Sequence, residues 1–160
     1  MSHYILQYLK TDTKARYQGY VYFFKEGFCW TNVLNPQARL LKVRLKNKTV
    51  NDVGSMSLFS ILDAIPNYFL ITLLNSEILF DYYREFINCT VNIQINDIRQ
   101  IPIIIPTKKQ LKNIETIFDK AYQIKIDEYS NQITQEDVKI QFMKIQQEIE
   151  QIIKNLYNLI

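Results

Sequence analysis

Histidine and glycine are scarce in this sequence, and their scarcity narrows the chemistry that the chain can perform. His3 is the sole histidine, and only three of the 160 residues are glycine. A histidine general base, a Ser-His-Asp triad and a histidine-ligated zinc site are therefore not expected. Glycine-rich loops that cradle nucleotide phosphates are missing as well. We expect the chain by itself to be non-catalytic and to hold no cofactor or metal.

Cysteine and long apolar runs are also in short supply. Cys29 and Cys89 are too few for a disulfide framework and lack metal-ligand spacing, so reduced thiols are expected. The sequence contains no window of about eighteen apolar residues, and its N-terminus lacks the pattern of a secretory signal peptide. These absences predict a cytoplasmic protein with no membrane partner.

Positive charge is concentrated in the first part of the chain. Residues 1–60 hold nine Lys and Arg against three Asp and Glu, whereas residues 61–160 hold ten against thirteen. This asymmetry favours a surface that faces a polyanion, although many strands carry solvated basic faces that bind nothing.

A sheet is expected in the first 60 residues. Aromatic and β-branched residues over 17–24 and 28–33 predict two strands. The clearest alternation follows, with apolar residues at Leu41, Val43 and Leu45 and basic residues between them. It predicts a strand whose outer face is entirely basic, formed by Lys42, Arg44, Lys46 and Lys48.

The stretch 73–106 combines a helix, a strand and a proline-bounded exit. Apolar residues at three- and four-residue steps predict helix over 58–74, interrupted by Pro66 at a first turn, and one amphipathic helix over 74–86 that Asn75-Ser76 could break. Alternation over 90–95 predicts a half-buried strand. The apolar run 103–105 lies between two prolines and predicts an edge strand or an extended connector.

Two helices are expected after residue 106. Thr107 with Gln110, and Thr134 with Asp137, have the spacing of capping boxes, in which each side chain binds the other residue's backbone N–H. Apolar residues of the second helix then recur at alternating steps of four and three, a repeat typical of a coiled coil. The first helix or another chain could cover this seam, which consists of Val138, Phe142, Ile145, Ile149, Ile152, Leu156 and Leu159.

Together these patterns predict an α+β fold in two parts. Residues 1–106 are expected to form the first part, with a small mixed or antiparallel sheet and packed helices. Residues 107–160 are expected to form the second part, a long helical hairpin with coiled-coil character.

The basic strand supplies the candidate nucleic-acid contacts. Alternate residues of a strand lie roughly 6 to 7 Å apart, close to the phosphate spacing along one nucleic-acid strand. Polar side chains nearby suit the readout of base edges. The predicted DNA-binding residues are Arg39, Lys42, Arg44, Lys46 and Lys48, together with Lys14, Arg16, Gln18, Thr31 and Asn32.

Residues 73–106 also resemble a known family. Leu-Leu-Asn-Ser at 73–76 leads into a helix with paired tyrosines, followed by Ile-Asn-Cys-Thr-Val-Asn-Ile-Gln-Ile-Asn-Asp-Ile at 87–98 and Ile-Pro at 101–102. Upstream, Lys-Glu-Gly-Phe-Cys-Trp-Thr at 25–31 is similar to the family's glycine-tryptophan strand. The pattern resembles the C-terminal target-recognition domain of TaqI-like adenine methyltransferases and type IIG restriction-modification enzymes.

The resemblance covers about residues 18–106 and implies a sequence-specific DNA-binding specificity domain of a restriction-modification system. It implies double-stranded DNA as one partner, and a methyltransferase or endonuclease domain or subunit as another. S-adenosylmethionine and Mg²⁺ would be bound by that catalytic partner, which would methylate adenine or cleave DNA. The helices at 107–160 are similar to those that space recognition domains in type I specificity subunits.

A protein-interaction module is the alternative. In that hypothesis the heptad helix joins two copies of the chain into a homo-oligomer. The sheet would then bind a protein, or nothing polyanionic. Retention of duplex DNA at low salt would separate the two hypotheses.

Overall fold

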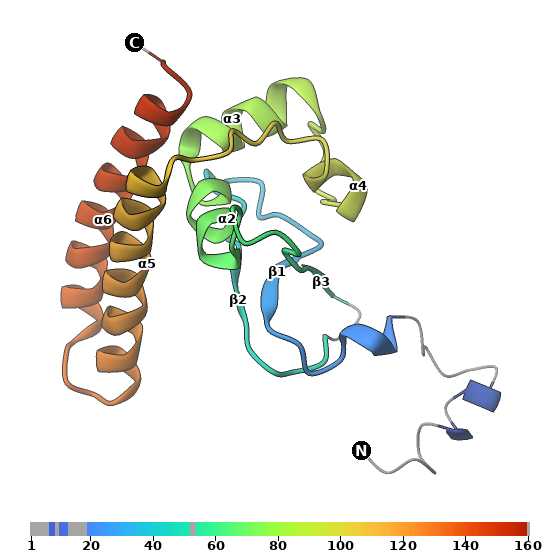
Figure 1. Ribbon diagram of the computed structural model, residues 1–160. Coiled ribbons are helices and arrows are strands. Elements are labelled where there is room, and N and C mark those ends of the chain that lie inside the picture. Colours follow the sequence, from blue (N-terminus) through green and yellow to red (C-terminus); the bar gives the residue numbers. More distant parts are fainter. Residues whose placement is uncertain (1–6, 9, 13–18, 52–53, 160) are drawn as a thin grey trace.

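The fold alternates short strands with helices and ends in two long helices. Figure 1 shows the computed structural model, which describes residues 7–8, 10–12, 19–51 and 54–159. The described residues confirm the predicted α+β class. The elements are η1 (Tyr20–Tyr22), β1 (Gly27–Thr31), β2 (Arg44–Lys46), β3 (Ser55–Leu58), α2 (Asn67–Leu74), α3 (Glu77–Phe86), α4 (Ile95–Ile98), α5 (Lys108–Tyr129) and α6 (Gln135–Leu156).

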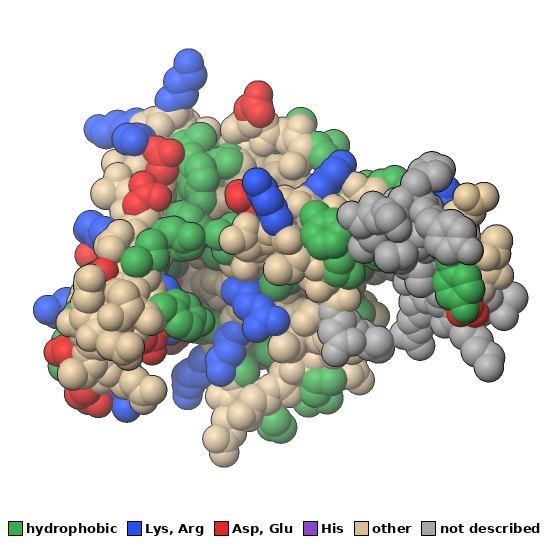
Figure 2. Space-filling view, turned by 90° about the horizontal axis from the view of Figure 1, so that it is seen from below, with side chains coloured by type: hydrophobic (Ala, Val, Ile, Leu, Met, Phe, Trp, Pro, Cys, Tyr) green, Lys and Arg blue, Asp and Glu red, His purple; other side chains and the backbone are tan. Residues whose placement is uncertain are grey.

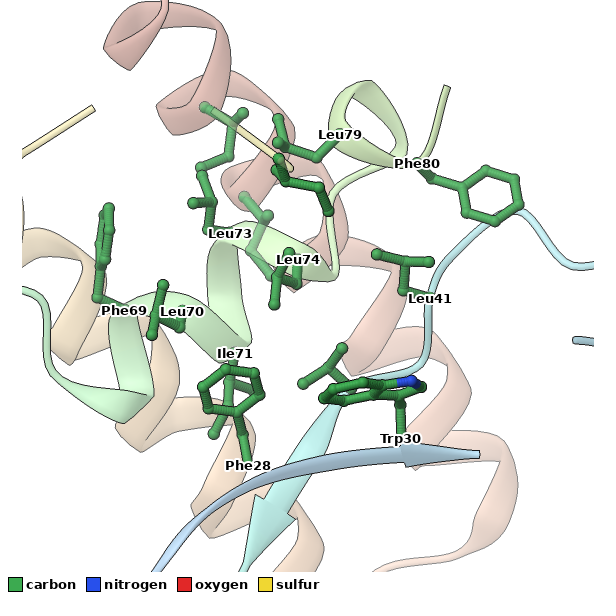
Figure 3. Packing of buried hydrophobic residues seen from close by; sticks show 14 of the residues in the cluster. Phe28, Trp30, Leu41, Phe69, Leu70, Ile71, Leu73, Leu74, Leu79 and Phe80 are labelled. Atoms are coloured by element: carbon green, nitrogen blue, oxygen red, sulfur yellow. The ribbon is translucent and has the colours of Figure 1, made fainter. Parts of the chain in front are cut away.

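The sheet of the described residues is antiparallel, with β1 in the centre of the order β2-β1-β3. On one face, Phe28 of β1 pairs with Leu45 and Leu58 of the two outer strands. Phe28 and Trp30 are 2% and 0% exposed. Figure 3 shows both rings rising from β1 toward α2, which covers this face of the sheet.

Helix α2 lies at the centre of the molecule because it is apolar around most of its circumference. Phe69, Leu70, Ile71, Leu73 and Leu74 are all buried in it. The sheet packs on one side of α2, and α5 and α6 pack against it as well (Figure 1). A helix that buries residues in all directions is typical of a core element.

The predicted break between two helices at 75–76 is confirmed. Asn75 ends α2, and the Ser76 hydroxyl caps α3 by accepting a hydrogen bond from Leu79 N–H at 3.2 Å.

The predicted helix over 58–66 is wrong, since β3 ends at Leu58 and a loop follows up to Pro66. Ser60 N–H donates to Asn67 Oδ1 at 3.0 Å, which turns the backbone there.

The predicted strand over 17–24 is wrong where the structure describes it, and residues 17–18 lie outside the described part. Residues 20–22 form the 3₁₀ turn η1, with left-handed backbone at Gly19 (φ 75°) and Phe24 (φ 60°). A positive φ at both ends is incompatible with a continuous strand. Aromatic content therefore predicted the wrong structure here.

The predicted strand over 90–95 is also wrong. The Asn88 amide accepts from Thr90 N–H at 2.8 Å and donates to the Asn92 carbonyl at 2.9 Å. These local bonds compete with strand pairing, and only an isolated bridge between Val33 and Asn92 forms. The run 103–105, by contrast, is the extended connector that was one of the two predictions for it.

Both predicted capping boxes are confirmed at the starts of α5 and α6. The heptad seam is not followed throughout. Ile153 is fully buried, whereas the predicted seam residue Ile152 is half-buried and Leu159 is 48% exposed. The reason is that α6 packs against α2 and α3 in addition to α5, which widens its buried stripe. Coiled-coil character is therefore not confirmed.

Helix α6 is fastened to the junction of α2 and α3 by two polar side chains. Glu150 Oε1 accepts a hydrogen bond from Glu77 N–H at 2.8 Å, and Gln146 Nε2 donates to the Asn75 carbonyl at 2.9 Å. One hydrophobic cluster runs from the sheet through α2 into α5 and α6. The core thus continues across residue 106, where the sequence pattern predicted a domain boundary.

Candidate nucleic-acid interface

The face of the sheet opposite α2 is polar. Residues paired directly across antiparallel strands share a face, and Cys29 pairs with Arg44 on β2 and with Ser57 on β3. Thr31 pairs with Ser55 in the same way. The polar sheet face therefore consists of Arg44, Cys29, Thr31, Ser55 and Ser57.

Arg44 is the basic residue that the structure places most clearly on the polar sheet face. Its side chain is exposed, and its Nε–H donates to the Cys29 thiol sulfur at 3.4 Å. That bond directs the side chain across β1 and covers Cys29, which is 5% exposed. A guanidinium has five N–H donors, so one bond to sulfur still permits paired contacts with a phosphate or a guanine.

Lys46 contradicts the prediction of an entirely basic exposed face. It is only 4% exposed, and its ammonium donates to the carbonyl oxygens of Lys25 at 2.8 Å and Thr49 at 2.7 Å. The ammonium also lies 5.3 Å from the centre of the Phe59 ring. Burial lowers the pKa of Lys46 from its ordinary value. This lysine holds two turns together and is not available to contact a phosphate from the surface.

Lys42 is exposed, but a strand does not position it. β2 begins only at Arg44, and Lys42 has a left-handed backbone with φ 53°. The neighbouring Val43 is fixed from a distance by Asn75, whose amide accepts from Val43 N–H at 3.0 Å and donates to Val43 C=O at 2.7 Å. The end of α2 therefore anchors the segment that carries Lys42.

The remaining predicted site residues are dispersed. Arg39 and Lys48 are exposed in the loops before and after β2. Thr31 is exposed at the end of β1, and the Asn32 backbone bonds Gly54 C=O and Ile93 N–H, both at 3.0 Å. Lys14, Arg16 and Gln18 lie outside the described residues. The structure thus places Arg44 and Thr31 on one face and leaves Arg39, Lys42 and Lys48 exposed in the segments before and after β2.

Sequence reasoning missed a cavity of about 750 Å³ that adjoins the polar sheet face. Side chains from η1, from the loops around β2 and β3, and from α4 line it. No alternation or spacing signal pointed to these residues, because the fold assembles them from separate segments of the chain. The polar and aromatic members of the lining are Tyr22, Phe23, Lys46, Thr49, Asn51, Ser55, Ser57, Phe59 and Arg99.

Asp97, which carries part of the family resemblance, has a structural role. Its Oδ2 accepts hydrogen bonds from Gln94 N–H and Asn88 Nδ2, both at 2.8 Å, and from the Tyr83 hydroxyl at 3.4 Å. Burial, followed by the nearby Asp97 carboxylate, raises the pKa of Tyr83 to about 12. The Asp97 network joins α3 to the start of α4 and keeps Tyr83 protonated.

The described part of the chain contains neither a candidate metal site nor a candidate membrane span. Within it, no group of three or more His, Cys, Asp or Glu side chains could hold a metal ion. The described helices also include none that is long and apolar enough to cross a membrane.

Comparisons with known proteins give no relative. No protein-family model matches the chain, and searches of curated proteins and of solved structures find no significant match.

Proposed function

We propose that the chain is a DNA-specificity domain of a restriction-modification system, which binds duplex DNA through the polar sheet face and the loops around β2. The observation that carries the proposal is that Arg44 lies on the polar sheet face while Arg39, Lys42 and Lys48 are exposed in the segments before and after β2. Figure 2 shows Lys and Arg side chains gathered near the middle of one face of the molecule. The pattern over residues 18–106 supports the same function.

Each part of this arrangement suits a different kind of DNA contact. Arg44 and Thr31 lie on a sheet face that offers side-chain donors and acceptors, which suits base edges. Arg39, Lys42 and Lys48 lie on exposed loops, which suits phosphates and fixes the register of the protein on the duplex. Lys46, a predicted contact, is excluded because its ammonium is buried.

Catalysis would then belong to a partner domain or subunit that binds S-adenosylmethionine and Mg²⁺. The helical hairpin of α5 and α6 is the part that we propose docks to this partner. Tyr122, Ile126 and Tyr129 recur at steps of four and three along α5, and they are 49%, 43% and 84% exposed. Burial of such an apolar stripe would favour association.

The homo-oligomer hypothesis rested on the α6 seam, which either the first helix or another chain could cover. In this structure Val138, Ile145, Ile149 and Leu156 of that seam are buried within one chain. α5, α2 and α3 supply the residues that cover them.

The test replaces Arg39, Lys42 and Arg44 together by alanine. We expect weaker binding to a duplex of random sequence and a salt slope that falls by about one unit for each phosphate that the variant no longer neutralises. Fluorescence anisotropy at several salt concentrations measures both quantities. The matched control replaces Lys112, Lys120 and Lys139, which are exposed on α5 and α6, and thus removes the same charge.

Two outcomes would contradict the proposal. Unchanged affinity and slope in the first variant would remove the polar sheet face from DNA binding. An equal loss of affinity in the control variant would mean that net charge alone, and no particular face, determines the binding.

A further inference from the structure

The cavity beside the polar sheet face is lined by aromatic and basic side chains. Phe59 and Tyr22 stack with ring centres 5.0 Å apart and an interplanar angle of 18°. Lys46 and Arg99 are the charged residues of its described lining, which contains no carboxylate. A ligand that enters this cavity should therefore combine a flat apolar surface with negative charge.

The Phe59 ring is held in place by the backbone beneath it. A Cβ atom added to Gly27 would lie 2.5 Å from Phe59 Cδ1 and 2.6 Å from the Leu58 carbonyl oxygen. The ring therefore lies directly on the one residue of β1 that has no side chain. The Lys46 ammonium, 5.3 Å from the ring centre, is fixed in turn by two carbonyl oxygens. A ring fixed in this way holds in place the Tyr22 ring that stacks on it.

The turn η1 brings more aromatic surface to the same place. Tyr22 is 47% exposed, and Phe23, which follows η1 directly, also lines the cavity. The Lys25 ammonium lies 5.5 Å from the centre of the Tyr22 ring. Exposed aromatic rings beside lysine and arginine are the combination with which proteins bind unpaired nucleotides, where bases stack and phosphates meet cations.

Polar groups for the edge of a base are present as well. The Asn51 amide donates to Ser57 Oγ at 2.5 Å and to the Ser55 carbonyl at 3.4 Å, which fixes its orientation at the cavity. Both N–H donors of this amide are thereby used, so its oxygen is the atom that could accept a hydrogen bond from a base edge.

The second cavity of the described residues provides an internal contrast. It has a volume of about 400 Å³ and is lined by Glu26 and Asp63, with Tyr68 and Phe118 as its aromatic residues. No lysine or arginine belongs to its described lining. The carboxylates of Glu26 and Asp63 would repel a phosphate. Both cavities have aromatic side chains, but only the larger one combines them with basic residues in its described lining.

We propose that the cavity between η1, β3 and α4 binds one unpaired nucleotide, with its base stacked on the Tyr22 ring, which Phe59 supports from its other face, and its phosphate near Arg99. This inference rests on the proposed function because its ligand is a nucleic acid, but it adds a site that paired duplex DNA cannot fill. Bound DNA with a base outside its helix would gain a contact that a continuous duplex lacks.

The experiment uses the full chain and three labelled DNAs that share one sequence of about 20 base pairs. The first is a continuous duplex, the second has one extra unpaired adenosine in the middle, and the third has an abasic residue at that position. Fluorescence anisotropy measures the three affinities. We expect the unpaired adenosine to strengthen binding by about fivefold or more, as one stacked base does, and the abasic residue to strengthen it much less.

Variants then locate the contact. Tyr22→Leu keeps an apolar side chain but removes the ring, and it should abolish the preference for the unpaired adenosine, whereas Tyr22→Phe should keep it. Tyr82→Leu, at an exposed tyrosine on α3 outside the cavity lining, is the matched control and should also keep it. Thermal unfolding by circular dichroism checks that each variant folds.

The outcomes separate this inference from the proposed function. Equal binding of the continuous and adenosine-bulged duplexes, or an unchanged preference in Tyr22→Leu, would overturn the inference while leaving duplex recognition intact. A Tyr22-dependent preference for the bulge without affinity for continuous duplex would support the inference and contradict the proposed duplex specificity. Absence of binding to all three DNAs would overturn both.

Discussion

In the helical part of the molecule, α5 and α6 begin at capping boxes formed by residues three positions apart. In the sheet part, by contrast, the segment before β2 is fixed at Val43 by the side chain of Asn75, thirty-two residues away. The helical part (67–156) repeats local signals turn after turn. The sheet part (19–58) has three strands of three to five residues, and it depends on single long-range contacts. The difference implies that one substitution should damage the sheet part more than the helical part.

Truncation of Phe28 should cause the largest loss of stability in the sheet part. Phe28→Ala should lower the free energy of unfolding by about 3–5 kcal/mol, because it leaves a cavity between β1 and α2. Denaturant unfolding followed by circular dichroism measures the change. Phe86→Ala makes the same truncation on α3, where the side chain is 75% exposed, and should change stability by less than about 1 kcal/mol. Similar destabilisation in both variants would contradict the comparison.

Asn75 should have the next largest effect. Asn75→Ala removes both hydrogen bonds to Val43 and leaves that backbone N–H and C=O without their partner. We expect the free energy of unfolding to fall by about 2 kcal/mol, together with faster amide hydrogen exchange over 41–46. Asn113→Ala on the exposed side of α5 is the control, and it should be neutral or slightly stabilising because alanine favours helix. Unchanged exchange over 41–46 would show that Asn75 does not anchor β2.

Tyr83 tests whether the helical part also depends on a single polar contact. The folded-state pKa of Tyr83, about 12, lies above the ordinary value of 10, so the unfolded chain loses this proton at lower pH than the folded chain. The stabilising contribution is complete below pH 10 and is lost as the pH rises through the folded-state pKa. Wild type should therefore lose about 1 kcal/mol more than Tyr83→Phe between pH 9 and pH 11. Parallel stability curves for the two proteins would contradict this expectation.

The same division explains what the sequence could predict. The starts of α5 and α6 and the break between α2 and α3 were predicted correctly, because caps and apolar spacing act within one or two turns of a helix. The strands over 17–24 and 90–95 were predicted wrongly, because aromatic content and alternation do not reveal positive φ values or the side-chain bonds of Asn88. Local patterns were most reliable where local contacts decide the structure, although the strand predicted over 28–33 was also found, as β1.

The candidate site shows the same limit. Alternation predicted correctly that Leu41 and Val43 are buried and that Lys42 and Arg44 are exposed. It could not reveal that Lys46 turns inward, because the two carbonyl oxygens that hold its ammonium belong to separate turns. The cavity residues escaped notice for a related reason, since Tyr22, Phe59 and Arg99 are distant in sequence and only the fold brings them together.

Trp30 is an intrinsic fluorescent probe of the sheet part. It is the only tryptophan of the chain, it is 0% exposed, and within the described structure its indole Nε1 has no hydrogen-bond partner. An indole in such dry, apolar surroundings emits at short wavelength and is shielded from aqueous quenchers. Its emission will shift to the red when β1 separates from α2, while α5 and α6 contribute no tryptophan signal. Fluorescence and far-ultraviolet circular dichroism can therefore follow the sheet part and the helices separately during one unfolding experiment.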